Sequence, residues 1–466
     1  MWFGTPRPRT IVCTALGVLC ASAAFAADPP PGGPVAPSPA FMLRDIWPGP
    51  GGPSSPVDPG VGAVGRTVYF SAADPDNGIE VWRTDGTRAG TRLVRDVSPG
   101  PFPSDPRVSP HVEGTSVIYF VADDGIHGAQ LWKTNGKPSG TRMVKDLSPG
   151  VWVHKVIGHV GPRLFFSTSE GVMATDGTEA GTHPVARDVE LCDVFDFALA
   201  PDAVYFIGRQ LPTGCELWRT DGTPAGTRLV KDIDPGPGTE PFRLAGLVYA
   251  GGLVYFDACV PGLCTFWRSD GTEGGTFDLG LTTTFIAGHP HEAFRDTLLL
   301  VRSTPEYGFE LWRTDGSVAG TQLVKDINPG PGGSLLSLGG VSQGDVYVFF
   351  AIDDQHGREP WRTDGTAAGT YLLRDLQPGP SAYPWNNLLG VPGVGTFFMG
   401  NDGIHGHELW LTDGYTAAGT RPITNFPASI GAIAPKIATD RYLLFFVGST
   451  AFGGEPWAYE LGGIPQ

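Results

Sequence analysis

The sequence is poor in positive charge for its length. Its 466 residues include 32 Lys and Arg against 48 Asp and Glu, which gives a formal net charge of −16 at pH 7. A surface of this sign repels nucleic-acid phosphates and anionic lipid headgroups. The charge balance therefore disfavours nucleic acid as a partner and disfavours attachment to anionic membranes.

The sequence also lacks an apolar run long enough to cross a membrane. The apolar stretch near the N-terminus, residues 11–25, follows Arg7 and Arg9 and ends in Ala24-Phe25-Ala26. A basic start, a short apolar segment and a small-x-small ending are typical of a cleaved signal peptide. We expect residues 1–26 to be this signal peptide, residues 27–40 to be a Pro/Gly-rich linker and residues 41–466 to form the repeat domain.

Cysteine is scarce, with six in the whole chain. Export would permit disulfides between those that follow the signal peptide. Cys259 and Cys264 flank a Pro-Gly turn between two strand-like runs, so we expect a bridge across that hairpin, with Cys192 and Cys215 as the remaining pair. The alternative is four free, buried thiols.

Familiar catalytic motifs are scarce. The chain has no His-Glu-x-x-His and no phosphate-binding loop, and Gly-x-Ser-x-Gly occurs once, at residues 340–344, without a helical pattern after the serine. Carboxylates are abundant, but they recur with a repeat, whereas catalysis usually needs an asymmetric constellation. We expect no catalytic residues, and the irregular third and fifth repeat units are the places where loops could form a site.

Helical periodicity is missing as well, and a repeat of turn-rich, aromatic-rich units takes its place. Gly 67 and Pro 44 accompany 11% aromatic residues. The units are 41 to 50 residues apart, measured from Trp132 to Met173 and from Trp82 to Trp132, and nine of them fill the chain. The recurring position is held by Trp82, Trp132, Met173, Trp218, Trp267, Trp312, Trp361, Trp410 and Trp457.

Each unit predicts four short antiparallel strands. They are a weakly apolar stretch after Pro-Gly (as in residues 334–338), an aromatic run (as in residues 348–350), a Glu-x-Trp segment and a Leu-Val-Lys-Asp segment. This is the signature of a propeller blade. We therefore predict an all-β fold, a single closed β-propeller of nine four-stranded blades, with eight blades if the irregular third unit fails to form one.

The two ends of the repeat complement each other. The last unit stops after Trp457 without its fourth strand, whereas residues 41–46 are a spare copy of that strand. Adding the N-terminal strand to the last blade would close the ring and leave no open sheet edge. We expect this closure.

The recurring polar residues are expected to be structural. In Thr-Asp-Gly-Thr-x-x-Gly-Thr the Asp accepts backbone hydrogen bonds in a turn; calcium binding is the alternative, although one carboxylate per blade is few for that ion. The tryptophans are expected to be packing anchors between blades, with sugar stacking as the alternative. The turn position is held by Asp85, Asp176, Asp221, Asp270, Asp315, Asp364 and Asp413, with Asn135 in the second unit.

The string Glu-Leu-Trp-x-Thr-Asp-Gly-Thr-x-x-Gly-Thr, at residues 216–227 and, with Ser317, at residues 310–321, resembles the repeat of the bacterial ELWxxDGT family, often called hyalin-like. The resemblance covers residues 41–461. The second, third, fifth and truncated ninth units depart from the pattern. The resemblance implies a secreted or surface bacterial protein and carries over no catalytic residues.

These observations favour a non-enzymatic binding or adhesion scaffold, monomeric and without a cofactor. It would lie in the periplasm, at the cell surface or outside the cell, with an extracellular protein or glycan as partner. One alternative is a propeller enzyme that acts on extracellular glycans or other polymers. The other is a calcium-stabilised structural surface protein.

Overall fold

The computed structural model describes residues 40–49, 60–109, 115–147, 149–186, 188–235, 243–260, 263–283, 291–334, 338–379, 387–427, 430–449, 451 and 453–461. The predicted signal peptide and all but the last residue of the predicted linker lie outside these residues. Within them, no helix is both long and apolar enough to span a bilayer. The only helical segment of the described part is the single 3-10 turn at Pro138–Gly140.

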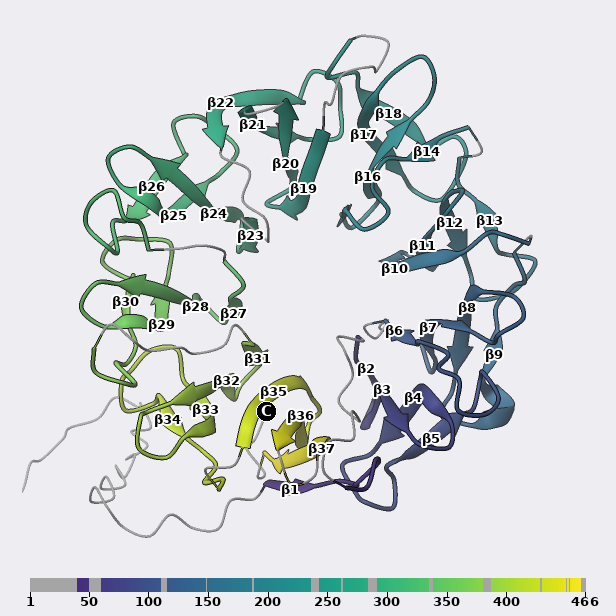
Figure 1. Ribbon diagram of the computed structural model, residues 1–466. Helices are drawn as coiled ribbons and strands as arrows, with labels where there is room; N and C mark the ends of the chain where they lie inside the picture. Colours follow the sequence, from purple (N-terminus) through teal and green to yellow (C-terminus); the bar gives the residue numbers. More distant parts are fainter. Residues whose placement is uncertain are drawn as a thin grey trace, which may run out of the picture. The chain divides into compact units, whose positions relative to one another are not determined.

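The described residues form a ring of nine antiparallel blades, which confirms the predicted propeller (Figure 1). The first three blades are β2 (Gly62–Val64), β3 (Thr67–Asp74), β4 (Gly78–Thr84) and β5 (Arg92–Arg95); β6 (Arg107–Val108), β7 (Ile118–Asp123), β8 (Ala129–Thr134) and β9 (Arg142–Met143); and β10 (Val153–Val160), β11 (Arg163–Thr168), β12 (Gly171–Thr175) and β13 (His183–Pro184). The irregular third unit thus forms a complete blade, so the eight-blade alternative is wrong.

The next three blades follow the same plan, except that two short strands share the inner edge of the fourth. They are β14 (Glu190–Leu191), β15 (Phe197–Leu199), β16 (Val204–Arg209), β17 (Cys215–Thr220) and β18 (Arg228–Lys231); β19 (Arg243–Ala250), β20 (Leu253–Val260), β21 (Leu263–Ser269) and β22 (Phe277–Thr283); and β23 (His291–Phe294), β24 (Thr297–Thr304), β25 (Gly308–Thr314) and β26 (Gln322–Lys325).

The last three blades complete the circle. They are β27 (Val341–Gln343), β28 (Val346–Asp353), β29 (Gly357–Thr363) and β30 (Tyr371–Leu372); β31 (Leu389–Val391), β32 (Gly395–Asn401), β33 (His407–Thr412) and β34 (Arg421–Pro422); and β35 (Ile430–Ala438), β36 (Tyr442–Ser449), β37 (Gly453–Glu460) and β1 (Ala40–Met42). Of the seventh blade's inner strand predicted at residues 334–338, residues 335–337 lie outside the described part. The described strand at this edge is β27, which starts at Val341, and Ser334 donates its hydroxyl to buried Glu310.

The N-terminal strand closes the ring as expected. Phe41 of β1 pairs with Ala458 of β37 in antiparallel register, and the Leu43 amide donates to the Pro456 carbonyl at 2.9 Å. The amide of Ile46 then donates to the buried Glu455 carboxylate at 2.9 Å. The first and last residues of the repeat therefore belong to one sheet.

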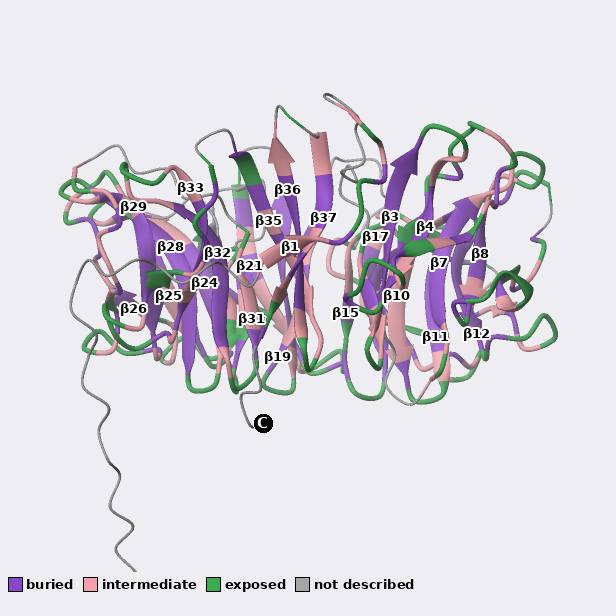
Figure 2. Cartoon of the chain, turned by 90° about the horizontal axis from the view of Figure 1, so that it is seen from below, coloured by how far each residue is buried: buried purple, intermediate pink, exposed green. Residues whose placement is uncertain are grey.

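The core lies between blades and comes mainly from the second strand of each. Side chains alternate between the two faces of a strand, so an aromatic run packs against both neighbouring blades. Phe70 of the first blade meets Phe446 of the ninth edge-on, with ring centroids 5.8 Å apart, and Phe350 meets Phe398 in the same way at 5.6 Å. Figure 2 shows the strands buried over most of their length, with exposed residues gathered in the loops at their ends.

Closure of the ring through β1 predicts that the stability of the protein depends on Glu455. In Glu455→Ala the amides of Ile46 and Trp47 lose their acceptor, and an unsatisfied buried donor costs about 1–3 kcal/mol. We expect a lower unfolding midpoint in urea and faster proteolysis around residues 43–47. Glu460→Ala, on the same strand but half-exposed, is the control. Equal stability of the two variants would contradict closure through this contact.

Candidate binding site

The recurring aspartates are engaged within their own turns. Asp85 Oδ1 accepts the Thr87 amide at 3.0 Å and the Thr87 hydroxyl at 2.6 Å, and this hydroxyl hydrogen bond is the main reason that the pKa of Asp85 lies below its ordinary value. A Cβ on Gly90 would lie 1.9 Å from the same oxygen, so the turn requires glycine there. The same backbone contact is made by Asp176, Asp221, Asp270, Asp315, Asp364, Asp413 and, through its amide oxygen, Asn135.

The arrangement of these aspartates does not suit a metal ion. Within the described ranges, no group of three or more His, Cys, Asp or Glu is placed to hold one. The aspartates lie one to a blade, and the turn itself uses their oxygens. Their geometry is that of a turn-stabilising carboxylate.

Four of the tryptophans stack on an aromatic ring of their own blade, and five lie under a cation of the preceding blade. Trp132 is 5% exposed, stacks on Phe120 with centroids 6.4 Å apart, and has Arg95 of the first blade 5.9 Å above it. Arg95 also donates to the Thr141 carbonyl at 2.7 Å. The same cation–ring pairing occurs in Arg44–Trp82, Lys231–Trp267, Lys325–Trp361 and Arg374–Trp410.

The other members of this series are placed similarly. Trp218 is buried against Phe206, Trp312 lies under Arg302 of its own blade, and Trp457 meets Phe426 edge-on at 5.3 Å. In the third blade Met173 replaces the indole, and Lys145 of the second blade still donates to the Thr182 carbonyl. The indoles of Trp82, Trp132, Trp218, Trp361 and Trp410 are buried and present no free face to a sugar, whereas Trp267, Trp312 and Trp457 are partly buried.

Sequence reasoning missed the role of the glutamate in Glu-x-Trp. Glu359 is fully buried, and its two oxygens accept the amides of Leu376 and Gln377, which follow the outer strand of the same blade. Burial raises the pKa of Glu359 from 4.5 to about 7. Its recurrence two residues before the tryptophan, with Gln130 in the second blade, was the available signal. Fully buried equivalents are Glu80, Glu216, Glu310 and Glu455, with Glu408 at 1% exposure.

Both expected disulfides are present in the structure. One joins Cys259 to Cys264 across the hairpin of the fifth blade, and the other joins Cys192 to Cys215 within the fourth. The second bridge fixes the segment between β14 and β15 against β17. That segment contains Phe195.

The residues left over by the repeat gather on the innermost strands of the second to fifth blades. We call Arg107, Trp152, His154, Lys155, Phe195 and Arg243 the inner-rim patch. They belong to β6, to β10 and the residue before it, to the β14–β15 segment and to β19; Figure 1 shows β6, β10 and β19 at the inner side of the ring. Trp152 is 57% exposed and Phe195 58%, in contrast to the covered tryptophans of the repeat.

Contacts between blades hold the patch together. Arg107 donates to the His154 carbonyl at 2.7 Å, and Lys155 donates to the Phe195 carbonyl at 2.8 Å. The rings of His154 and Phe195 lie 6.3 Å apart at an interplanar angle of 66°. Arg243 lies 3.8 Å from Asp193, which in turn accepts the Phe195 amide at 2.8 Å. The patch is therefore continuous from the second blade to the fifth.

The indole of the patch is oriented by the neighbouring blade. A Cβ on Gly128, in the β7–β8 loop, would lie 3.0 Å from Trp152 Nε1, so the indole rests against that glycine. Gly128 has φ +72°, a conformation that glycine adopts without strain. Trp152 is thus held on one side and open to solvent on the other.

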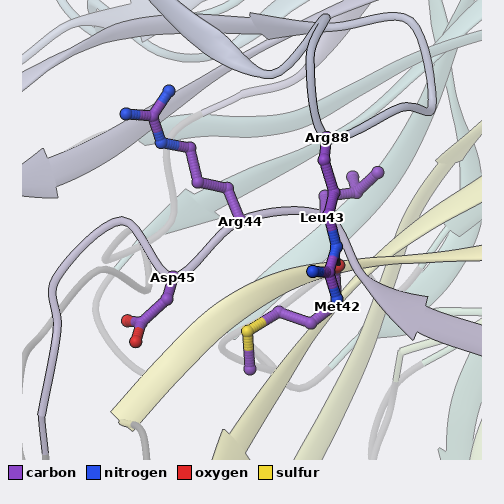
Figure 3. A pocket seen from close by; sticks show the side chains of 5 residues that line it. All are labelled: Met42, Leu43, Arg44, Asp45 and Arg88. Carbon is purple, nitrogen blue, oxygen red and sulfur yellow. Dashed lines mark hydrogen bonds between the residues drawn. The ribbon is translucent and has the colours of Figure 1, made fainter.

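Two grooves lie at the ring seam, and a third is lined by residues of the third and fourth blades, Glu170, Asp188 and Arg209 among them. One of about 290 Å³ is lined by Met42, Leu43, Arg44, Asp45 and Arg88, and Figure 3 shows Arg88 beside Met42 while Arg44 points away from that contact. Arg88 donates to the Met42 carbonyl and Arg44 to the Thr91 carbonyl. These side chains serve ring closure.

Comparisons with known proteins describe the fold. No family model matches the chain, and no curated protein matches it. Similar solved structures include a puromycin hydrolase (15% identity, TM-score 0.40, covering 82% of this chain and 63% of that one) and prolyl oligopeptidase B from Galerina marginata (12% identity, TM-score 0.42, covering 74% and 56%). The chain spans about three fifths of the length of these proteins, and at such TM-scores the likeness carries no argument about activity.

The buried glutamates predict that the ring is more stable at pH 5 than at pH 8. Between the unfolded pKa near 4.5 and the folded pKa of about 7, the native carboxyl of Glu359 keeps a proton that the unfolded chain releases, so the free energy of unfolding falls as pH rises. Each unit of pKa shift corresponds to about 1.4 kcal/mol. Urea titrations across this range measure the slope.

Matched variants isolate this effect from other titrating groups. Glu359→Gln, which copies the amide that Gln130 supplies at the equivalent position, should flatten the dependence on pH, whereas Gln130→Glu should steepen it. His127, His356 and His405, whose pKa values are raised mainly by side-chain hydrogen bonds to aspartates, change stability in the same direction and are common to all three proteins. An unchanged slope in both variants would contradict the assignment.

Proposed function

We propose that the protein is an exported, non-enzymatic binding scaffold whose ligand docks on the inner-rim patch. One observation carries this proposal: the repeated polar and aromatic residues are mostly engaged within the ring, whereas Trp152 and Phe195 are exposed, and Lys155 donates to the Phe195 carbonyl. Exposed aromatic side chains grouped with arginine are characteristic of interaction sites.

The ionisable groups support binding over catalysis. The accessible His–Asp pairs, such as His127–Asp124 and His405–Asp402, recur at equivalent loops, whereas catalysis usually needs an asymmetric constellation. The pair that joins the fifth and sixth blades, His291 with Asp257 at 3.0 Å, is buried, with His291 3% exposed. A general base must reach its substrate. The enzyme alternative is tested by the same experiment.

Export and family membership are part of the proposal. The two disulfides support an oxidising compartment, since such bonds persist outside the cytosol. The Glu-Leu-Trp-x-Thr-Asp-Gly-Thr repeat supports membership of the ELWxxDGT family. A monomer at the bacterial surface or beyond it is the form in which we propose that the scaffold acts.

Binding should depend on the two exposed aromatic rings. On glycan and peptide arrays, Trp152→Ala combined with Phe195→Ala should weaken capture of the wild-type ligand about tenfold or more, since aromatic anchors at hot spots contribute about 2 kcal/mol or more. Phe277→Ala combined with Tyr371→Ala, partly exposed on the outer strands, is the control.

The recovered ligand distinguishes scaffold from enzyme. Mass spectrometry after prolonged incubation should return the ligand unchanged. Cleaved ligand would favour the enzyme alternative. Equal capture by wild type and the Trp152/Phe195 variant would show that the patch is not the site.

A further inference from the structure

The cations of the inner-rim patch are positioned by neutral groups. Arg107 and Lys155 each donate to a backbone carbonyl, and neither has a carboxylate of the described residues within 4.0 Å. A guanidinium has five N–H donors and an ammonium three, so each cation keeps donors beyond the one that its carbonyl accepts. Both charges are thus held in place without being neutralised by contact.

Two carboxylates of the described residues interact with the patch, and both are engaged. Asp193 lies 3.8 Å from Arg243, and Asp196 is directed away from solvent, where its oxygens accept the Gly246 and Leu247 amides at 2.6 and 3.0 Å. Burial is the main reason that the pKa of Asp196 is raised. The charge of Lys155 lowers this pKa, but less than the hydrogen bonds from the Leu247 and Gly246 amides do. Three cations therefore face two committed carboxylates, in a chain whose net charge is −16.

One aromatic residue of the patch accepts a hydrogen bond from a cation, and the other lies two residues from a cation's acceptor. Lys155 is bonded to the carbonyl of Phe195 itself, and Arg107 is bonded to His154, which is two residues from Trp152. An exposed ring offers a surface to the apolar face of a ligand, while a neighbouring guanidinium or ammonium attracts a carboxylate. The ligand that satisfies both is a ring with an apolar face and an attached anionic group.

The number of cations in the patch distinguishes between two candidate ligands, a nucleic acid and an acidic polysaccharide. Affinity for a nucleic acid depends on releasing many counterions, typically through about six to ten phosphate contacts. Three cations on an acidic protein fall short of that number. A chain of sugars that bears carboxylates needs fewer ionic contacts, because its ring faces also contribute.

We propose that the inner-rim patch binds an acidic polysaccharide, with a uronate carboxylate on Arg107 and Lys155 and sugar rings against Trp152 and Phe195. This inference rests on the proposed function and names the ligand class for the same site. The patch extends over four blades, which suits an extended polymer better than a compact metabolite.

The test uses calorimetry on the purified chain with both disulfides formed. Oligogalacturonate is the probe, a neutral galactan oligosaccharide of equal length is its uncharged counterpart, and polyglutamate is the peptide counterpart. We expect oligogalacturonate to bind most tightly and to weaken as salt is added. Arg107→Gln with Lys155→Gln should reduce its affinity about tenfold per cation removed.

Arg92→Gln with Arg142→Gln, which removes two exposed cations of the outer strands, should leave affinity unchanged. Thermal melting checks the fold of each variant, and Arg243→Gln serves if the double variant unfolds. Absent or equal binding of the uronate relative to its counterparts overturns the ligand class.

The failures can be told apart. Loss of the captured ligand in the Trp152/Phe195 variant, with no loss in the Arg107/Lys155 variant, overturns the acidic ligand and leaves the scaffold intact. Unchanged binding of every ligand in both variants overturns the site as well.

Discussion

Pairing of β1 with β37 is the constraint on which the rest of the structure depends. Blades of a propeller are stable because each buries both faces against its neighbours, so an unpaired seam would expose apolar strands such as the one containing Phe446. The chain meets this need by placing its first strand in its last sheet. Each blade then packs against a neighbouring blade on both of its faces.

The repeat supplies two further contacts that hold blades in sequence. A cation at the end of one outer strand crosses to the next blade, as Arg95 does to Trp132 and Thr141, so these contacts run in one direction around the circle. Within a blade, a buried glutamate such as Glu359 satisfies the amides where the chain leaves the outer strand. The turn aspartate, the tryptophan, the cation and the buried glutamate of the repeat thus all stabilise the blades or the contacts between them.

Much of the fold could be predicted from the sequence, because the tryptophan spacing and the spare strand at residues 41–46 are properties of the repeat. The position of the inner strands could not, since residues such as 341–343 carry little apolar patterning of their own and are placed by their neighbours. The site was harder still. Trp152 and Phe195 lie far apart in sequence on irregular segments, and only the ring brings them to one rim.

The exposed aromatic residues of the inner-rim patch lie on the irregular third and fourth blades. The third blade has Met173 in place of the indole, and the fourth has a bridge-fixed segment at its inner edge. Contacts nearer the axis, such as Lys155 to Phe195, link these blades instead. The departures from the repeat in these two blades are therefore where Trp152 and Phe195 become available to a ligand.

Native-state hydrogen exchange tests the closed ring most directly. The amides of Leu43 and Ile46, which donate to Pro456 and Glu455, should exchange as slowly as amides in the central strands of interior blades such as β24. Exchange of these two amides at the rate of an unstructured segment, with β24 still protected, would contradict the account.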